Sequence, residues 1–213
     1  MGVKIRTLLI SDLHIGNSAF DEHVTIDLLQ KEEFDTLILN GDIVDLWLTS
    51  MSAAIQTVLF KLIESLSRKK LVFWVLGNHD AQAFCSKNSI IIVNQCILNS
   101  GEILVVHGHQ AYRYGNDCLI DHVLNKIVFW TWGLFGCDLQ VKLNKTRIYQ
   151  WYINRKRLRV LKLFPGFKHI IMGHTHIDGV INLNNTTITD LGSCPITRSY
   201  AIIENNCVIL KHF

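Results

Sequence analysis

With 213 residues, about half of them hydrophobic, the chain is long enough to bury one sizeable α/β core. No Pro-rich or Ser-rich linker divides it, and no apolar run approaches the roughly 18 residues of a membrane span, so we expect a single domain over 1–213 without a transmembrane helix. The six cysteines include no Cys-X-X-Cys pair, and no secretory segment precedes the first predicted strand. Both features predict free thiols and a cytoplasmic location.

Five short apolar runs predict strands buried on both faces of a sheet, and each leads directly into a motif of histidine and acidic residues. The runs cover 4–11, 36–40, 70–76, 103–106 and 169–172. The motifs that follow are, in order, Asp12-Leu13-His14, Gly41-Asp42-Ile43-Val44-Asp45, Gly77-Asn78-His79-Asp80, His107-Gly108-His109 and Gly173-His174-Thr175-His176. Because ligands bind beyond the carboxyl ends of strands in open α/β sheets, we expect the five loops to converge on one site.

The side chains of these motifs are suited to two adjacent divalent metal ions. A carboxylate can give one oxygen to each of two ions roughly 3.5 to 4 Å apart, and we expect Asp42 to bridge them in this way. In Asp-X-His and His-X-His, residues two apart on an extended chain project to the same side, so one turn of chain delivers two ligands. One such motif alone could be a turn whose polar side chains satisfy the backbone, but five in series favour a metal site.

His79 is the predicted catalytic residue for proton transfer. It follows Asn78 and, on an extended chain, points away from it, toward the place of a leaving-group oxygen. Asp80 is expected to hold this imidazole protonated, as a general acid requires, while a metal-bound water or hydroxide attacks phosphorus. His109 is interpreted either as a residue that lines the site or as an ordinary loop residue. Asp45 is interpreted as a brace for the second loop.

The segment from about 112 to 164 interrupts the alternation of strands and helices and is predicted to be a helical insertion. Its middle, 127–137, is strongly apolar, whereas 142–162 holds eight Lys or Arg and no acid, although the net charge of the chain is only +3. One interpretation is an apolar core under a solvated basic face. The other is an amphipathic cap whose apolar side chains receive acyl chains or enter a bilayer surface, while its cations bind anionic headgroups or a diphosphate.

Side chains of the insertion support the cap interpretation. Trp130, Trp132 and Trp151 suit an interface because an indole carries a polar N–H on an apolar ring. Arg147 and Arg155 are the cations expected to contact substrate. After the insertion, apolar runs at 180–183, 186–191, 199–203 and 208–211 predict strands, and Asn-Asn pairs at 184–185 and 205–206 predict hairpin turns between them.

The order and content of the five motifs resemble the calcineurin-like metallophosphoesterases, which hydrolyse phosphate esters with two metal ions. The resemblance spans 12–176 and implies a four-layer α/β/β/α sandwich with two mixed sheets. It also implies a first metal held by Asp12, His14, Asp42 and His176, and a second held by Asp42, Asn78, His107 and His174. Substrate is expected to contact Asn78, His79 and His109. The implied ions are two Mn²⁺, although the ligand types also fit Fe, Zn or Co.

A helical insertion between the fourth and fifth motifs, together with Gly-Asp-Ile-Val-Asp-Leu-Trp in the second, resembles the branch that contains UDP-2,3-diacylglucosamine pyrophosphohydrolase. That resemblance implies a lipid-linked nucleotide diphosphate as substrate and peripheral contact with an anionic membrane. The best-known members of the branch carry Arg where this chain has His79, and arginine contributes charge but not a proton. Two alternatives stay open: a nuclease or phosphoprotein phosphatase on the same fold, and a non-catalytic scaffold of the retromer type.

Overall fold

The computed structural model of the protein describes residues 5–17, 21–80, 89–112, 146–183 and 185–213. The strands in this part of the chain are β1 (Thr7–Ile10), β2 (Thr36–Asn40), β3 (Leu71–Val75), β4 (Ile90–Val93), β5 (Cys96–Leu98), β6 (Ile103–Val105), β7 (His169–Met172), β8 (Asp178–Leu183), β9 (Thr186–Leu191), β10 (Ser199–Glu204) and β11 (Cys207–His212). The helices are α1 (Glu22–Lys31), α2 (Met51–Ala54), α3 (Val58–Ser67), α6 (Arg147–Leu163) and α7 (Cys194–Thr197), with 3₁₀ turns η1 (Asn99–Gly101) and η2 (His109–Tyr112).

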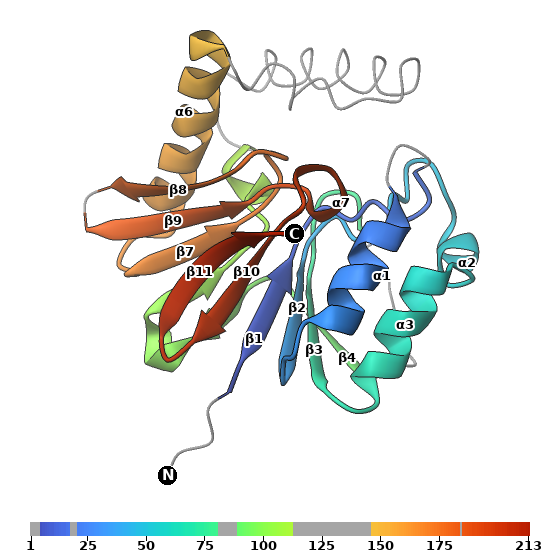
Figure 1. Ribbon diagram of the computed structural model, residues 1–213. Helices are drawn as coiled ribbons and strands as arrows, with labels where there is room; N and C mark the ends of the chain where they lie inside the picture. The colour runs from blue at the N-terminus through green and yellow to red at the C-terminus, as the bar shows by residue number, and fades with distance from the viewer. Residues whose placement is uncertain (1–4, 18–20, 81–88, 113–145, 184) are drawn as a thin grey trace.

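The strands form two mixed sheets (Figure 1). In the first, the order is β11-β10-β1-β2-β3-β4, and β1 to β4 run parallel to one another. In the second, the order is β5-β6-β7-β9-β8, with β6, β7 and β9 parallel and β5 and β8 antiparallel at the edges. The parallel strands matter most for function, because all five motifs follow one of them.

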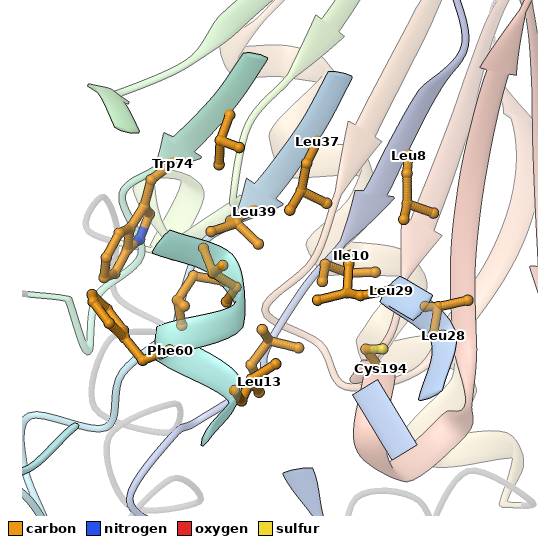
Figure 2. Close-up of a cluster of buried hydrophobic side chains, with 14 of the residues drawn as sticks. Leu8, Ile10, Leu13, Leu28, Leu29, Leu37, Leu39, Phe60, Trp74 and Cys194 are labelled. Atoms are coloured by element: carbon orange, nitrogen blue, oxygen red, sulfur yellow. The ribbon is translucent and has the colours of Figure 1, made fainter. Parts of the chain in front are cut away.

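Three separate apolar cores divide the molecule into four layers. The first packs α1 and α3 against the first sheet, with Phe60 and Trp74 among its largest side chains (Figure 2). The second lies between the two sheets, and the third joins the second sheet to Val160 of α6. Strand β1 shows how one strand serves two cores: Leu8 faces the helices and Leu9 faces the other sheet, since successive side chains alternate between faces. The four-layer α/β/β/α prediction is therefore confirmed.

Local sequence signals account for many of the element boundaries. Helix α1 begins after Asp21, whose carboxylate accepts a hydrogen bond from the backbone N–H of His23, and α3 begins after Thr57, whose hydroxyl accepts from Phe60. The β10–β11 hairpin turns at Asn205 and Asn206, both at positive φ, as the Asn-Asn pair predicts. Strands β4 and β5 were not among the predicted strands.

The C-terminal part of the predicted insertion is helix α6, which packs over the second sheet as the fourth layer (Figure 1). The proposed acyl-binding segment, with Trp130 and Trp132, lies outside the described residues. The basic residues of α6 are not all solvated: Lys156 and Arg157 are buried, whereas Arg147 and Arg155 are exposed. No helix in the described ranges is both long and apolar enough to cross a membrane.

Candidate metal centre

The five motif loops meet at the carboxyl ends of the parallel strands. Backbone hydrogen bonds join the first loop to the second, from Asp12 N to Gly41 O at 3.1 Å and from His14 N to Asp42 O at 2.9 Å. A further bond, from Gly173 N to His107 O at 3.1 Å, joins the fifth loop to the fourth. The predicted convergence of loops is therefore present in the structure.

Three groups of possible metal ligands lie in this region of the described structure, and the third, His14, Asp45 and His79, shares His14 with the first. In the first, Asp12, His14 and His176 place ligand atoms within 4.8 Å of one another. The two Nε2 atoms of His14 and His176 are 3.3 Å apart, and Asp12 Oδ1 is 3.3 Å from His176 Nε2. The side chains of all three are buried or nearly so. These are the residues expected to hold the first metal together with Asp42.

The second group consists of Asp42, His107 and His174, whose ligand atoms also lie within 4.8 Å of one another. Asp42 Oδ2 is 3.2 Å from His107 Nε2, and the ring centroids of His107 and His174 are 5.1 Å apart. Asn78 belongs to the neighbouring loop, and its Oδ1 atom is buried. The first and second groups each contain three of the four residues in one of the ligand sets that the resemblance implies. Metal binding by these residues, and the bridging role of Asp42, stay predictions.

The donor atoms themselves fit divalent metals. Asn78 Oδ1 is buried and has no hydrogen-bond partner within the described structure, while Asp12 Oδ1 and His107 Nε2 are buried against other candidate ligands, His176 Nε2 at 3.3 Å and Asp42 Oδ2 at 3.2 Å. Buried polar atoms are normally hydrogen-bonded, so a buried cluster of metal-ligating atoms that includes an unsatisfied oxygen requires an explanation such as an ion. Carboxylate, amide oxygen and imidazole donors together suit Mn²⁺, Fe²⁺, Zn²⁺ or Co²⁺ rather than a sulfur-rich cluster.

Hydrogen bonds to the remaining atoms orient two of these ligands. The Oδ2 atom of Asp12 accepts from Ser11 Oγ and from His174 N, the latter at 3.1 Å, which leaves Oδ1 toward His176. His107 donates from Nδ1 to the carbonyl of Asn40 at 2.9 Å, so its Nε2 atom keeps a lone pair for a metal. Such outer contacts fix the tautomer and orientation of metal-binding histidines.

The backbone at the ligands is strained. Asp12, His14, Asp42, His174 and His176 all have positive φ, between 45° and 70°. Non-glycine residues in this region cost about 1 to 3 kcal/mol each and persist where the surroundings hold them, typically at functional sites. Close packing adds to the constraint: a Cβ atom at Gly41 would lie 2.3 Å from His107 Nδ1, so only glycine fits there.

The electrostatics of the site favour the charged forms of Asp12 and Asp42 and the neutral forms of His14 and His174. Burial alone would raise the pKa of Asp42, but the charge and hydrogen bond of His107 hold it well below the usual value. Burial lowers the pKa of His14 and, more strongly, of His174. At His107, burial is outweighed by the Asp42 charge, which raises the pKa to about 9. In the metal-free chain His107 therefore carries a proton that a metal would displace.

His79 lies beside the two groups, and its partner is Asp45 rather than the predicted Asp80. His79 donates from Nδ1 to Asp45 Oδ1 at 3.0 Å, and its Nε2 is 4.0 Å from Asp42 Oδ2, so the free nitrogen faces the candidate centre. The indole of Trp47 stacks on the imidazole at a centroid distance of 3.8 Å. One carboxylate and one aromatic face thus fix the ring.

Asp80 instead organises the backbone. Its carboxylate accepts hydrogen bonds from the backbone N–H groups of Asp42, Ile43, Val44 and Gly77, at 2.8 to 3.2 Å, and from Trp74 Nε1 at 3.0 Å. These contacts tie the second loop to the third. The expectation that Asp80 holds His79 is therefore wrong, because its two oxygens are directed into the loop backbone.

The remaining predicted substrate contacts differ in their setting. The His109 ring lies 5.4 Å from the His107 ring and 6.4 Å from the His174 ring, so His109 lines the second group. Arg147 and Arg155 are exposed residues of α6, and Arg155 lies over the ring of Trp151. Their contact with substrate stays a prediction. Asp45 was expected only to brace the second loop, so its contact with His79 was missed, as was the stacking of Trp47, although the two stand three and five residues after Asp42.

Comparison with known proteins is consistent with this geometry. The model of the calcineurin-like phosphoesterase family matches residues 5–178. No curated protein sequence matches the chain at a significant level. The solved structure of YfcE, a phosphoesterase from E. coli, is similar with a TM-score of 0.53 and 14% identity, over 96% of this chain and 91% of that one. Vacuolar protein sorting 29 from Cryptosporidium parvum is similar with a TM-score of 0.50 and 15% identity, over 98% and 96% of the two chains. At such identities the likeness concerns the fold.

Proposed function

The chain belongs to the calcineurin-like phosphoesterase family, and we propose that it hydrolyses phosphate ester or diphosphate bonds at a centre of two divalent ions. One observation carries this proposal: two groups of buried or partly buried candidate ligands, Asp12/His14/His176 and Asp42/His107/His174, stand side by side with a fixed histidine next to them. A purely structural role would not require so many strained and unsatisfied polar residues in one place.

The residues have separable tasks in this proposal. Asp12, His14, Asp42 and His176 would hold one ion, and Asn78, Asp42, His107 and His174 would hold the other. When bound, the two ions supply positive charge to the phosphoryl oxygens and lower the pKa of a water molecule for attack on phosphorus. His109 contacts the phosphoryl group in this proposal, and its position beside the second group supports that role.

His79 acts as the general acid. With Nδ1 bonded to Asp45, its Nε2 atom is the one that can give a proton to the leaving oxygen. Trp47 covers one face of the ring and limits its rotation. Asp45 also approaches His14, with 3.4 Å between its Oδ2 and His14 Nδ1, so one carboxylate orients both a metal ligand and the proton donor.

For the substrate, we propose a lipid-linked nucleotide diphosphate, with Mn²⁺ as the ion and transient contact with an anionic membrane surface. Exposed Arg147 and Arg155 on α6 support this choice, since cations bind diphosphates and anionic headgroups. Trp151 supports it as well, because 61% of this residue is exposed and indoles favour membrane interfaces.

The test begins with chain purified under chelation and then supplied with Mn²⁺, Zn²⁺, Fe²⁺ or Co²⁺. We expect metal-dependent release of product from a p-nitrophenyl phosphate monoester, a diester or a nucleotide diphosphate, and activity on lipid-linked diphosphate that rises with detergent. Absence of hydrolysis with every ion would contradict the function. Cleavage of nucleic acid that falls steeply with salt would point to the nuclease alternative.

A further inference from the structure

Arg157 is a buried arginine on the basic helix α6. Only 4% of it is accessible. Its guanidinium donates from Nε to Asp190 Oδ2 at 3.1 Å, from one Nη atom to the carbonyl of Ile177 at 3.0 Å and from the other to Asn154 Oδ1 at 3.3 Å. An arginine with three satisfied donors in a dry environment is held in one orientation, and it holds its partners in turn.

Two of the three partners of Arg157, Asp190 and the Ile177 carbonyl, contact Thr175 of the fifth motif, and the third, Asn154, lies on α6. Asp190, at the end of β9, is completely buried and accepts a second hydrogen bond at Oδ2 from the hydroxyl of Thr175, at 2.7 Å. The same hydroxyl accepts from Ile177 N at 3.1 Å. Thr175 stands between His174 and His176, so the chain of contacts runs from helix α6 to the residue that separates the two candidate ligands.

The fifth motif needs such support because its backbone is unfavourable. His174 has φ 70° and His176 has φ 56°, both in the left-handed region. Two such residues around one threonine would relax toward ordinary conformations unless neighbouring groups fix the segment. Arg157 and Asp190 fix it at the Thr175 side chain and at the Ile177 carbonyl.

We propose that Arg157 is a positioning residue that reaches from helix α6, through Asp190 and Thr175, to hold His174 and His176 in the geometry for metal binding. This inference rests on the proposed function in so far as the two histidines bind metal. It assigns the basic helix a role at the centre itself, in addition to any contact with substrate. The helix then forms part of the metal site although it supplies no ligand.

The charge of Arg157 contributes as well as its hydrogen bonds. Burial raises the pKa of the Asp190 carboxyl to about 6, while the Arg157 charge and the hydrogen bonds from Thr175 and Arg157 favour the ionised form. Without the guanidinium, Asp190 would be a buried carboxylate lacking its counter-ion, or would take up a proton and could donate where it now accepts. In both cases the hydrogen bond between the Thr175 hydroxyl and the Asp190 carboxylate changes.

The test measures Mn²⁺ affinity rather than turnover. We expect Arg157→Met to weaken Mn²⁺ binding, followed by calorimetry and by the electron paramagnetic resonance of free Mn²⁺, by about 10- to 100-fold, as outer-shell changes do. Val160→Ala is the matched control, since Val160 is buried on the same helix but packs against the apolar core. This control should lower the thermal midpoint and keep Mn²⁺ affinity within about twofold of wild type.

A second variant keeps the proposal testable if Arg157→Met fails to fold. Thr175→Val removes the hydroxyl at the other end of the chain of contacts, and it should weaken Mn²⁺ binding in the same range. In the double variant the two losses should not add, because both act through Asp190. Wild-type affinity in both single variants, or an equal loss in Val160→Ala, would overturn the proposal. A wild-type chain that binds two Mn²⁺ but hydrolyses no ester would contradict the proposed function alone.

Discussion

Asp45→Asn tests the assignment of the proton donor most directly. The change keeps the size of the side chain but removes the negative charge that accepts from His79 Nδ1 at 3.0 Å. Burial alone would raise the pKa of Asp45, yet its contacts with His14 and His79 lower it, so the charged carboxylate is favoured. A hydrogen bond to a charged group contributes about 1.5 to 3 kcal/mol. If this hydrogen bond stabilises the transition state and not the bound substrate, the turnover of Asp45→Asn should be about 10- to 150-fold lower than that of wild type.

The assay compares two aryl phosphates, since a good leaving group such as p-nitrophenolate needs less protonation than phenolate. Asp45→Asn should slow phenyl phosphate more than p-nitrophenyl phosphate, with metal content measured in parallel because Asp45 also approaches His14. Asp80→Asn is the matched control, and it should lower thermal stability without changing the ratio of the two rates, since Asp80 bonds to loop backbone. The reasoning would be refuted if Asp80→Asn changed that ratio and Asp45→Asn did not.

Three further expectations concern the centre. His79→Ala should lower turnover by about 10² to 10⁴ and leave metal content nearly intact, and loss of metal in this variant would contradict the division of roles. Asp42→Ala should remove both metal, measured by elemental analysis, and activity, because this carboxylate is the proposed bridge; retained metal would argue against bridging. His107, with a pKa raised to about 9, is protonated in the metal-free chain at neutral pH and must lose that proton to bind. Mn²⁺ affinity should therefore rise about tenfold per pH unit below pH 9, and a flat profile between about pH 6 and 8 would show that no proton is displaced.

Much of the fold and the candidate ligands could be predicted because the signals are local. A strand buried on both faces is a run of apolar residues, as in β2, whose five residues are all buried. A parallel strand delivers whatever follows it to one edge of the sheet, so Asp42 and His174 could be placed in one site from their positions alone. Strands β4 and β5 were missed because neither leads into a motif of histidine and acidic residues.

The partners of the ligands could not be predicted in the same way. The choice between Asp45 and Asp80 as the partner of His79 depends on the loop backbone, and side chains alternate regularly only on an extended chain. The chain instead turns through the left-handed region at Asp12, His14 and Asp42, which redirects the side chains. Arg157 poses a similar problem: it is one of eight basic residues in 142–162, and its partner Asp190 lies 33 residues away. What distinguishes Arg157 from the other basic residues is its contact with Asp190, and a single sequence does not reveal a contact between residues so far apart.

The strained backbone at the candidate ligands should make the thermal stability of the protein depend on bound metal. Five ligand candidates at positive φ, at about 1 to 3 kcal/mol each, oppose the fold when no ion offsets them. A metal that binds only the folded state stabilises it by about 2.7 kcal/mol at a concentration 100 times its dissociation constant. For a chain of this size, that energy corresponds to about 5 to 11 °C in thermal midpoint. We therefore expect Mn²⁺ to raise the midpoint of the wild-type chain by this amount, EDTA to reverse the rise, and neither to affect Asp42→Ala. An equal response in that variant would mean that the ion acts at another place in the protein.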